Sequence, residues 1–210
     1  MFDAILFDLD GTLIDTESLA LAAGLAAFAE LGHPVTVDFL HQLVGVDLPT
    51  GSKIIQAALP ALDHAALHPL WQGGFLAAME ANGLPLKPGA LELLAARLCP
   101  MALVTSSARK EAHLKLAKAG IAGMFDLVIT VDDVTAPKPN PAPYLLAAER
   151  LGVDPARCLA FEDSETGAEA AHRAGCFVVQ IPDVVPSTGR WAHHLAEDLL
   201  AGARLAGLVI

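Results

Sequence analysis

The sequence predicts an α/β fold, in which a doubly wound parallel sheet carries a small four-helix domain inserted after its first strand. Three observations lead to this prediction: short apolar runs recur along the chain, helical patterns lie between the later runs, and one long gap separates the first two runs. Continuous rather than alternating apolar runs indicate strands covered on both faces. The alternation of strand and helix favours a parallel sheet joined by right-handed crossovers.

Five apolar runs are predicted to be the strands of this sheet. Each is short, almost free of polar residues, and followed by a polar or turn segment. The runs are Ala4 to Phe7, Met101 to Thr105, Leu127 to Thr130, Cys158 to Phe161 and Phe177 to Ile181. Apolar residues at helical spacing predict a helix after each of the later turns, over Gly89 to Leu98, Arg109 to Ala119, Pro143 to Leu151 and Ser164 to Ala174.

The gap between the first two strands is far longer than a single crossover helix requires. Four helices are predicted within it, over Thr16 to Leu31, Val37 to Leu43, Ser52 to Leu59 and about Pro69 to Ala81. His68 directly precedes Pro69, so we do not expect the fourth helix to extend back through His68. The predicted domains are a core of residues 1–15 and 86–210 and a helical cap of residues 16–85.

The composition excludes several classes of protein. Hydrophobic residues make up 54% of the 210, which is enough for a large core and argues against disorder. The net charge is −11 and the 13 Lys and Arg form no cluster, so we expect no nucleic-acid partner. No stretch reaches the roughly 18 apolar residues of a membrane helix. The start of the sequence has no basic segment before an apolar one, so we expect no signal peptide and a cytoplasmic location.

Two acidic pairs follow predicted strands. Asp8 and Asp10 end the first strand, and Glu162 and Asp163 end the fourth. Ligands of open α/β sheets bind beyond the carboxyl ends of the strands, where these side chains would meet. Such crowding of carboxylates is unfavourable without a divalent cation, and oxygen ligands point to Mg²⁺. The alternative is that they are surface residues at strand and helix ends.

Hydroxyl groups and a lysine are expected at the same edge. Thr105 and Ser106 end the second strand, where hydroxyl and backbone N–H groups can hold phosphoryl oxygens. A simple helix-capping role for Ser106 or Ser107 remains open. Lys138 stands between two prolines, which fix the backbone, so its ammonium group can offset repulsion between an anionic nucleophile and phosphate.

These motifs, in this order along essentially the whole chain, resemble the haloacid-dehalogenase superfamily. The likeness is greatest to the branch that contains β-phosphoglucomutase, phosphoglycolate phosphatase and sugar phosphatases. It implies a Rossmann-like core, a helical cap and Mg²⁺-dependent hydrolysis of a small phosphorylated metabolite. We expect the protein to be a monomer or weak dimer. The implied metal ligands are the Asp8 carboxylate, the Asp10 backbone carbonyl, Asp163, and Glu162 directly or through water.

The resemblance also implies a role for each matching residue. Asp8 corresponds to the nucleophile, which becomes an aspartyl phosphate, and Asp10 to the acid that protonates the leaving group and later activates water. Thr105 and the Ser106 backbone N–H correspond to the phosphate-binding groups, and Lys138 to the charge-stabilising lysine. In the cap, we expect Glu17, which lies near the expected hinge, and Gly45, the cap glycine, to contact the substrate.

Other activities remain open in the sequence. A β-phosphoglucomutase-like phosphomutase is the first alternative, but the mutase carries a His and an Arg in its cap where this chain has Ala20 and Leu48. A haloacid dehalogenase would have no leaving alkoxide for Asp10 to protonate. A receiver-like signalling module would also phosphorylate an aspartate, but would leave the helical insertion unexplained.

Overall fold

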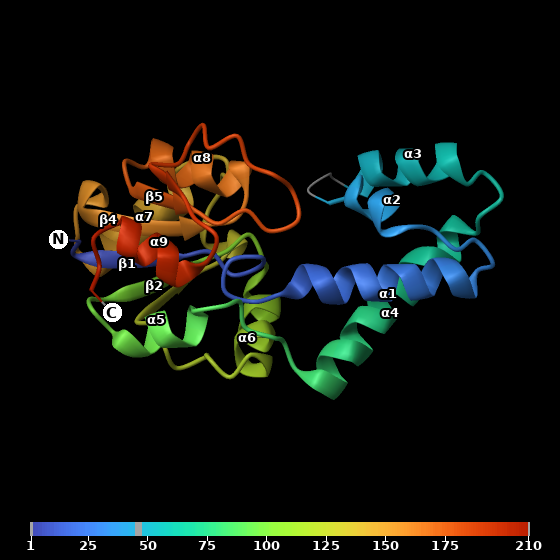
Figure 1. Cartoon of the computed structure of the whole chain (residues 1–210), viewed down its shortest axis with the longest axis horizontal. Coiled ribbons are helices and arrows are strands. Elements are labelled where there is room, and N and C mark those ends of the chain that lie inside the picture. Colours follow the sequence, from blue (N-terminus) through green and yellow to red (C-terminus); the bar gives the residue numbers. More distant parts are fainter. Residues whose placement is uncertain (1, 45–47, 210) are drawn as a thin grey trace. The chain divides into compact units, whose positions relative to one another are not determined.

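The computed structural model describes residues 2–44 and 48–209. The chain forms two compact units, Met1–Asp15 with Leu84–Ile210, and Thr16–Gly83. The first unit is a parallel sheet with helices, and the second is helical (Figure 1). The α/β class and the doubly wound parallel sheet predicted from the sequence are confirmed. Within the described ranges, no helix has both the length and the apolar character needed to cross a membrane.

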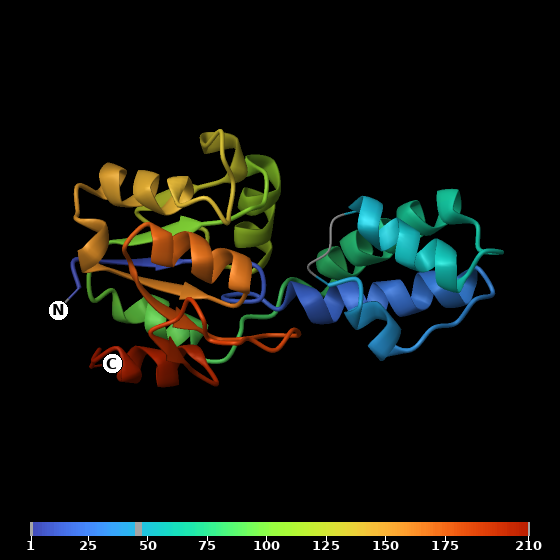
Figure 2. The same ribbon diagram turned by 90° about the horizontal axis from the view of Figure 1, so that it is seen from above.

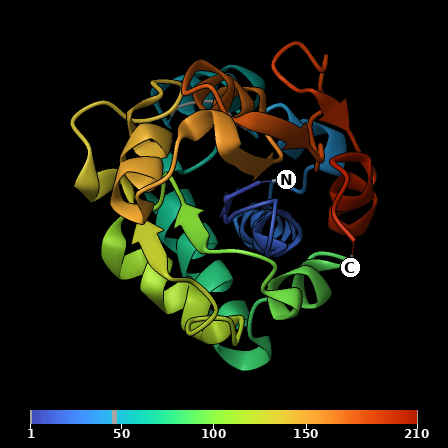
Figure 3. The ribbon, with the colours of Figure 1, turned by 90° about the vertical axis from the view of Figure 1, so that its left-hand side faces the viewer.

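Within residues 2–44 and 48–209, six parallel strands form the sheet, in the order β3-β2-β1-β4-β5-β6. Their bounds are β1 Ala4–Phe7, β2 Met101–Val104, β3 Leu127–Ile129, β4 Cys158–Glu162, β5 Phe177–Gln180 and β6 His194–Leu195. Figure 3, which looks along the strands, shows β1 between β2 and β3 on one side and β4 and β5 on the other. The short strand β6 was missed, because two residues of mixed polarity give no apolar run.

The register of the strands brings three chain segments to one edge. Phe7 of β1 lies opposite Leu103 of β2 and Phe161 of β4. The residues that follow these positions therefore leave the sheet side by side, at its carboxyl edge. Asp8 is held there by its backbone N–H, which donates to the Phe161 carbonyl over 3.0 Å.

Helices cover both faces of the sheet, as its continuous apolar strands require. Figure 2 shows α7 and α8 on one face and α5 and α9 on the other. The helices of this unit are α5 Ala90–Ala96, α6 Arg109–Lys118, α7 Ala142–Leu151, α8 Glu165–Arg173 and α9 Leu199–Leu205, with short 3₁₀ turns at Val131–Asp133 and Pro155–Arg157. Leu6 and Ala160 belong to the buried cluster under α7 and α8. Phe7 and Phe161 stack on each other at 5.4 Å.

The second unit contains α1 Thr16–Glu30, α2 Val37–His41, α3 Leu48–Ala58 and α4 His64–Asn82. The expectation that the last helix would not pass back through His68 is wrong, because α4 begins at His64 and contains Pro69. The Asp63 side chain caps it by accepting the N–H groups of Ala65 and Ala66 over 3.0 and 3.1 Å. This cap stabilises the first turn, so the helix tolerates the loss of the backbone hydrogen bond that Pro69 cannot donate.

An aromatic cluster holds the helical unit together. Phe28 of α1 is fully buried and makes edge-on contacts with Phe39 at 5.9 Å and Trp71 at 5.8 Å. The Trp71 indole N–H donates to the Ala20 carbonyl over 2.7 Å, which joins α4 to α1. A side chain at Gly24 would overlap the Trp71 ring, so glycine is required for the two helices to approach this closely.

A buried carboxylate closes the turn that follows β3. Asp133 accepts hydrogen bonds from the backbone N–H and the hydroxyl of Thr130 over 3.0 and 2.8 Å, and pairs with Arg109 over 2.8 Å. Burial raises the pKa of Asp133, but these hydrogen bonds and the Arg109 charge outweigh it and hold this pKa at about 2.

Asp133→Asn is expected to reduce the free energy of unfolding at neutral pH by on the order of 1 kcal/mol, since the half-exposed Arg109 is screened by solvent. The folded-state pKa lies below the unfolded value, so the contribution is complete above about pH 4 and is lost as the pH falls towards 2. Thermal unfolding of both proteins between pH 5 and pH 2 measures this. A difference that does not change with pH would contradict the assignment.

Candidate active site

Lys138 is the centre of the ionic network at the carboxyl edge of the sheet. Its side chain is only 5% exposed. Its ammonium group donates to Asp8 Oδ1 over 2.7 Å, to Glu162 Oε1 over 2.6 Å and to the Val104 carbonyl over 2.8 Å. A lysine ammonium has three N–H donors, so this geometry uses all of them and fixes the position of the charge.

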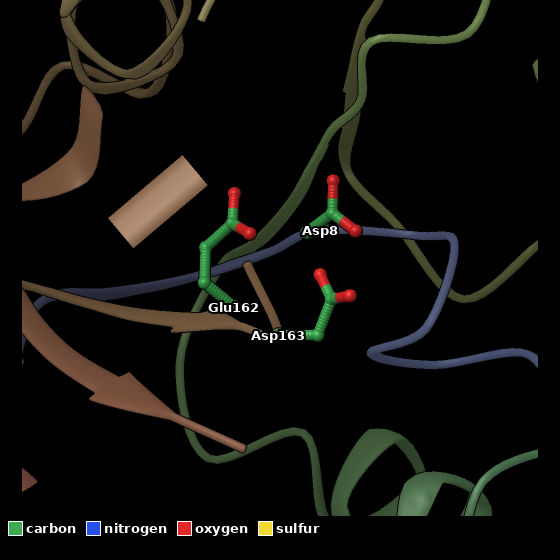
Figure 4. A group of neighbouring side chains, drawn as sticks. All are labelled: Asp8, Glu162 and Asp163. Carbon is green, nitrogen blue, oxygen red and sulfur yellow. The ribbon is translucent and has the colours of Figure 1, made fainter. Parts of the chain in front are cut away.

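Three carboxylates gather beside this lysine. Asp8 follows β1, Glu162 ends β4 and Asp163 follows it, and Figure 4 shows the three carboxylates near one another. One oxygen from each lies within 4.8 Å of the others. Asp8 and Glu162 are buried, and Asp163 is partly exposed. Residues separated by more than 150 positions therefore meet because their strands are neighbours.

The electrostatics of the cluster favour a bound cation. Burial raises the pKa of Asp8 to about 7, with the Lys138 charge acting against this and Glu162 adding to it. Burial and the charges of Asp8 and Glu162 raise the pKa of Asp163 well above its usual range. One ammonium group thus does not balance three carboxylates. An all-oxygen donor set with excess negative charge fits a hard divalent cation such as Mg²⁺.

Two further residues set the position of the Glu162 carboxylate, and the sequence analysis assigned a role to neither. The buried hydroxyl of Tyr144 in α7 donates to Glu162 Oε1 over 2.6 Å, and its ring lies 5.3 Å from the Lys138 ammonium. Gly167 in α8 leaves the space that Glu162 occupies, because a Cβ there would overlap its carboxylate. Tyr144 lies six residues after Lys138, on the buried face of α7. Helical periodicity in the sequence indicates that this face is buried, but it does not show that Tyr144 contacts Glu162.

The end of β2 brings hydroxyl groups to the same edge. Thr105 is buried, and its Oγ1 accepts the backbone N–H of Ser107 over 3.0 Å. Ser106 is exposed between them. Neither serine caps α6, because its N-cap is Ala108 and the Arg109 N–H donates instead to Asp132 over 2.8 Å. The serines are therefore available for other contacts.

The Asp10 side chain lies outside the three-carboxylate group and contacts a lysine that sequence analysis missed. Lys115 of α6 is 2.8 Å from Asp10 Oδ1, and the Ser107 hydroxyl donates to Asp10 Oδ2 over 3.0 Å. The sequence does indicate that Lys115 is buried, since it lies three residues after Ala112 on the face of α6 that the apolar pattern buries. Of the two predicted cap contacts, Glu17 lies in the first turn of α1 in the helical unit, and Gly45 lies outside the described residues.

The fold and this site define an α/β enzyme whose buried aspartate, lysine and acidic cluster lie beyond the carboxyl ends of parallel strands. The sequence model of the haloacid dehalogenase-like hydrolase family matches residues 2–175 of this chain. The chain is 34% identical over 178 residues to the "Phosphorylated carbohydrates phosphatase" of Thermotoga maritima, covering 82% of each protein. The chain therefore belongs to the haloacid dehalogenase-like hydrolase family.

Solved structures agree with this assignment. A Thermotoga maritima protein provisionally named a β-phosphoglucomutase is 29% identical, with a TM-score of 0.82 over 99% of this chain and 100% of that one. A family hydrolase from Deinococcus radiodurans, solved with bound phosphate and sodium, is 27% identical, with a TM-score of 0.84 over 98% and 96% of the two chains. The similarity extends over at least 96% of each protein, so it includes residues of both units of this chain.

Proposed function

We propose that this protein is a Mg²⁺-dependent phosphatase that hydrolyses a small phosphomonoester through an aspartyl phosphate on Asp8. The observation that carries the proposal is the contact of Lys138 with both Asp8 and Glu162, beside Asp163. This arrangement holds one carboxylate ready to attack phosphorus, with a fixed cation beside it and further carboxylates suited to a metal. The phosphatase name of the Thermotoga maritima relative supports the same activity.

The chemistry consists of two in-line displacements at phosphorus. In the first, Asp8 attacks and Asp10 donates a proton to the departing oxygen of the substrate. In the second, Asp10 accepts a proton from the water that attacks the aspartyl phosphate, and inorganic phosphate leaves Asp8. Lys138 offsets the charge that builds up on the phosphoryl oxygens, which the Thr105 hydroxyl and Ser106 N–H bind.

The proposed Mg²⁺ ligands are the carboxylates of Asp8 and Asp163 and the Asp10 backbone carbonyl, with Glu162 direct or through water. When bound, Mg²⁺ would neutralise charge on the nucleophile and the phosphoryl group. Tyr144 and Lys138 already fix Glu162, and one oxygen from each of the three carboxylates lies within 4.8 Å of the others. Preorganised charge of this kind is usually the largest single contribution to catalysis.

The substrate is proposed to be a sugar phosphate or a similar metabolite, by analogy with the phosphorylated-carbohydrate phosphatase of Thermotoga maritima. The helical unit is proposed to act as a cap that selects this substrate, with Glu17 and Gly45 among its contacts. We further propose a cytoplasmic monomer or weak dimer. A phosphomutase is less favoured, since Ala20 and Leu48 stand where the mutase has its His and Arg.

A phosphate-release screen over phosphorylated metabolites with Mg²⁺ tests the proposal. We expect release from sugar phosphates and little from phosphoproteins or nucleic acids. Conversion of β-glucose 1-phosphate without net phosphate release would favour the mutase instead. Halide release without metal would identify a dehalogenase, and a phospho-Asp8 that persists for hours would identify a signalling module.

Mg²⁺ is expected to stabilise the protein, and Asp163→Asn to abolish this response. At one hundred times its dissociation constant, a ligand specific to the folded state adds about 2.7 kcal/mol, or roughly 5–10 °C in melting temperature for a chain of this size. Thermal unfolding with Mg²⁺ and with EDTA measures the shift without any substrate. Glu92→Gln, at an exposed position in α5, is the matched control and should respond like the wild type. An equal Mg²⁺ shift in the Asp163 variant would rule out this ligand.

A further inference from the structure

Lys115 forms a second ionic network, separate from that of Lys138. Its side chain is 8% exposed, although it belongs to a surface helix. The ammonium group lies 2.8 Å from Asp10 Oδ1 and 2.6 Å from Glu111 Oε1, and donates to the Ser107 hydroxyl over 3.0 Å. That hydroxyl in turn donates to Asp10 Oδ2 over 3.0 Å. Lys115 and Ser107 therefore hold one oxygen each of the Asp10 carboxylate.

Two ordinary roles fit this geometry less well. A site for an anionic group of the substrate would need uncompensated positive charge, but two carboxylates already face the single ammonium of Lys115. A surface ion pair that only stabilises α6 would need no more than Glu111, which lies one turn earlier on the same helix. Neither role accounts for a contact that reaches from α6 to the loop after β1 and includes Ser107.

We propose that Lys115 is a positioning residue that acts through Asp10. Lys115 holds Oδ1 and Ser107 holds Oδ2, so the plane of the Asp10 carboxyl group is fixed relative to the leaving oxygen of the substrate. Ser107 is fixed in turn because its backbone N–H donates to Thr105 Oγ1. This inference rests on the proposed function, since Asp10 needs a defined orientation only if it transfers a proton.

The proposal predicts an effect that depends on the leaving group. An alkoxide that leaves from a sugar or glycerol phosphate needs a proton from Asp10, whereas nitrophenolate leaves without one. Loss of Lys115 should therefore slow the first displacement with the alkyl ester and leave the first displacement with the nitrophenyl ester largely unchanged. The second displacement, in which Asp10 accepts a proton from water, is the same for both esters. A lysine that served only the fold would slow the first displacement equally for both substrates.

The first test compares Lys115→Met with the wild type on glycerol phosphate and on p-nitrophenyl phosphate. We expect kcat/KM, which reports the steps up to departure of the leaving group, to fall by about 10- to 100-fold on the first and by less than about threefold on the second. Lys115→Arg should recover much of the loss, and Lys110→Met, at an exposed position of the same helix, should behave as the wild type. Equal losses of kcat/KM on both substrates, or no loss on either, would overturn the proposal.

A second test asks whether Lys115 acts through Asp10 alone. In an Asp10→Ala background, adding Lys115→Met should cause no further fall in the rate on glycerol phosphate, because the group that Lys115 positions is gone. Multiplicative losses in the double variant would overturn the proposal.

A crystal structure of Lys115→Met gives a readout that needs no activity. The Asp10 carboxyl group should turn or occupy two orientations, and an unchanged position would overturn the proposal. If the wild type released no phosphate from any ester, the proposed function would fail, while the positioning of Asp10 would still be decided by that structure.

Discussion

Asp8→Asn is expected to abolish phosphate release. An amide oxygen is a poor nucleophile and cannot form the acyl phosphate, so the loss should reach at least about 10⁴-fold, as for other enzymes that lose their nucleophile. The contact with Lys138 can survive, because the amide oxygen still accepts a hydrogen bond at the position of Asp8 Oδ1. Steady-state release of phosphate from the best substrate of the screen measures the effect.

The chemical intermediate provides the control for this variant. Acid quenching of the wild type during turnover with labelled substrate should trap label on the protein, and Asp8→Asn should trap none. The melting temperature of the variant should stay close to that of the wild type or exceed it, because one of three crowded carboxylates is neutralised. Full activity of a correctly folded Asp8→Asn protein would exclude Asp8 as the nucleophile.

The sequence was sufficient to predict the sheet and the group of residues at its edge. Buried parallel strands are continuous apolar runs, so five of the six strands in the described residues were predicted to within one residue at each end. The position of Asp8 beside Glu162 then follows from topology, since the carboxyl ends of parallel neighbours lie at one edge. No periodicity in the sequence shows that Lys138 points inwards, and the expectation depended on the motif.

Other features could not be predicted because they depend on particular contacts. Helix α4 begins five residues earlier than expected, since the Asp63 cap outweighs the local effect of Pro69. The two-residue strand β6 forms only because β5 offers it a partner. Tyr144 and Lys115 lie on faces that the pattern correctly buries, but their partners come from distant parts of the chain. Long-range partners of single polar side chains are not encoded in local sequence.

Lys138→Met is expected to cause the largest combined loss of activity and stability. The substitution leaves Asp8 and Glu162 as neighbouring buried carboxylates without their cation. Removal of one partner from a buried ion pair typically costs about 3–5 kcal/mol. Activity should fall as well, because the charge that would face the transferring phosphoryl group is gone. Chemical denaturation with EDTA present measures the stability, and phosphate release measures the activity.

A double variant separates the two effects of Lys138. Glu162→Gln removes one of the two charges that Lys138 balances. The amide oxygen can still accept the hydrogen bond that the Tyr144 hydroxyl donates. Lys138→Met with Glu162→Gln should therefore recover much of the lost free energy of unfolding, because fewer buried charges remain unpaired. It should recover no activity, because the cation is still missing. If stability losses simply added in the double variant, Lys138 would act on the fold by some means other than neutralising this cluster. If activity returned with stability, the lysine would be a structural residue and its catalytic role would have to be withdrawn.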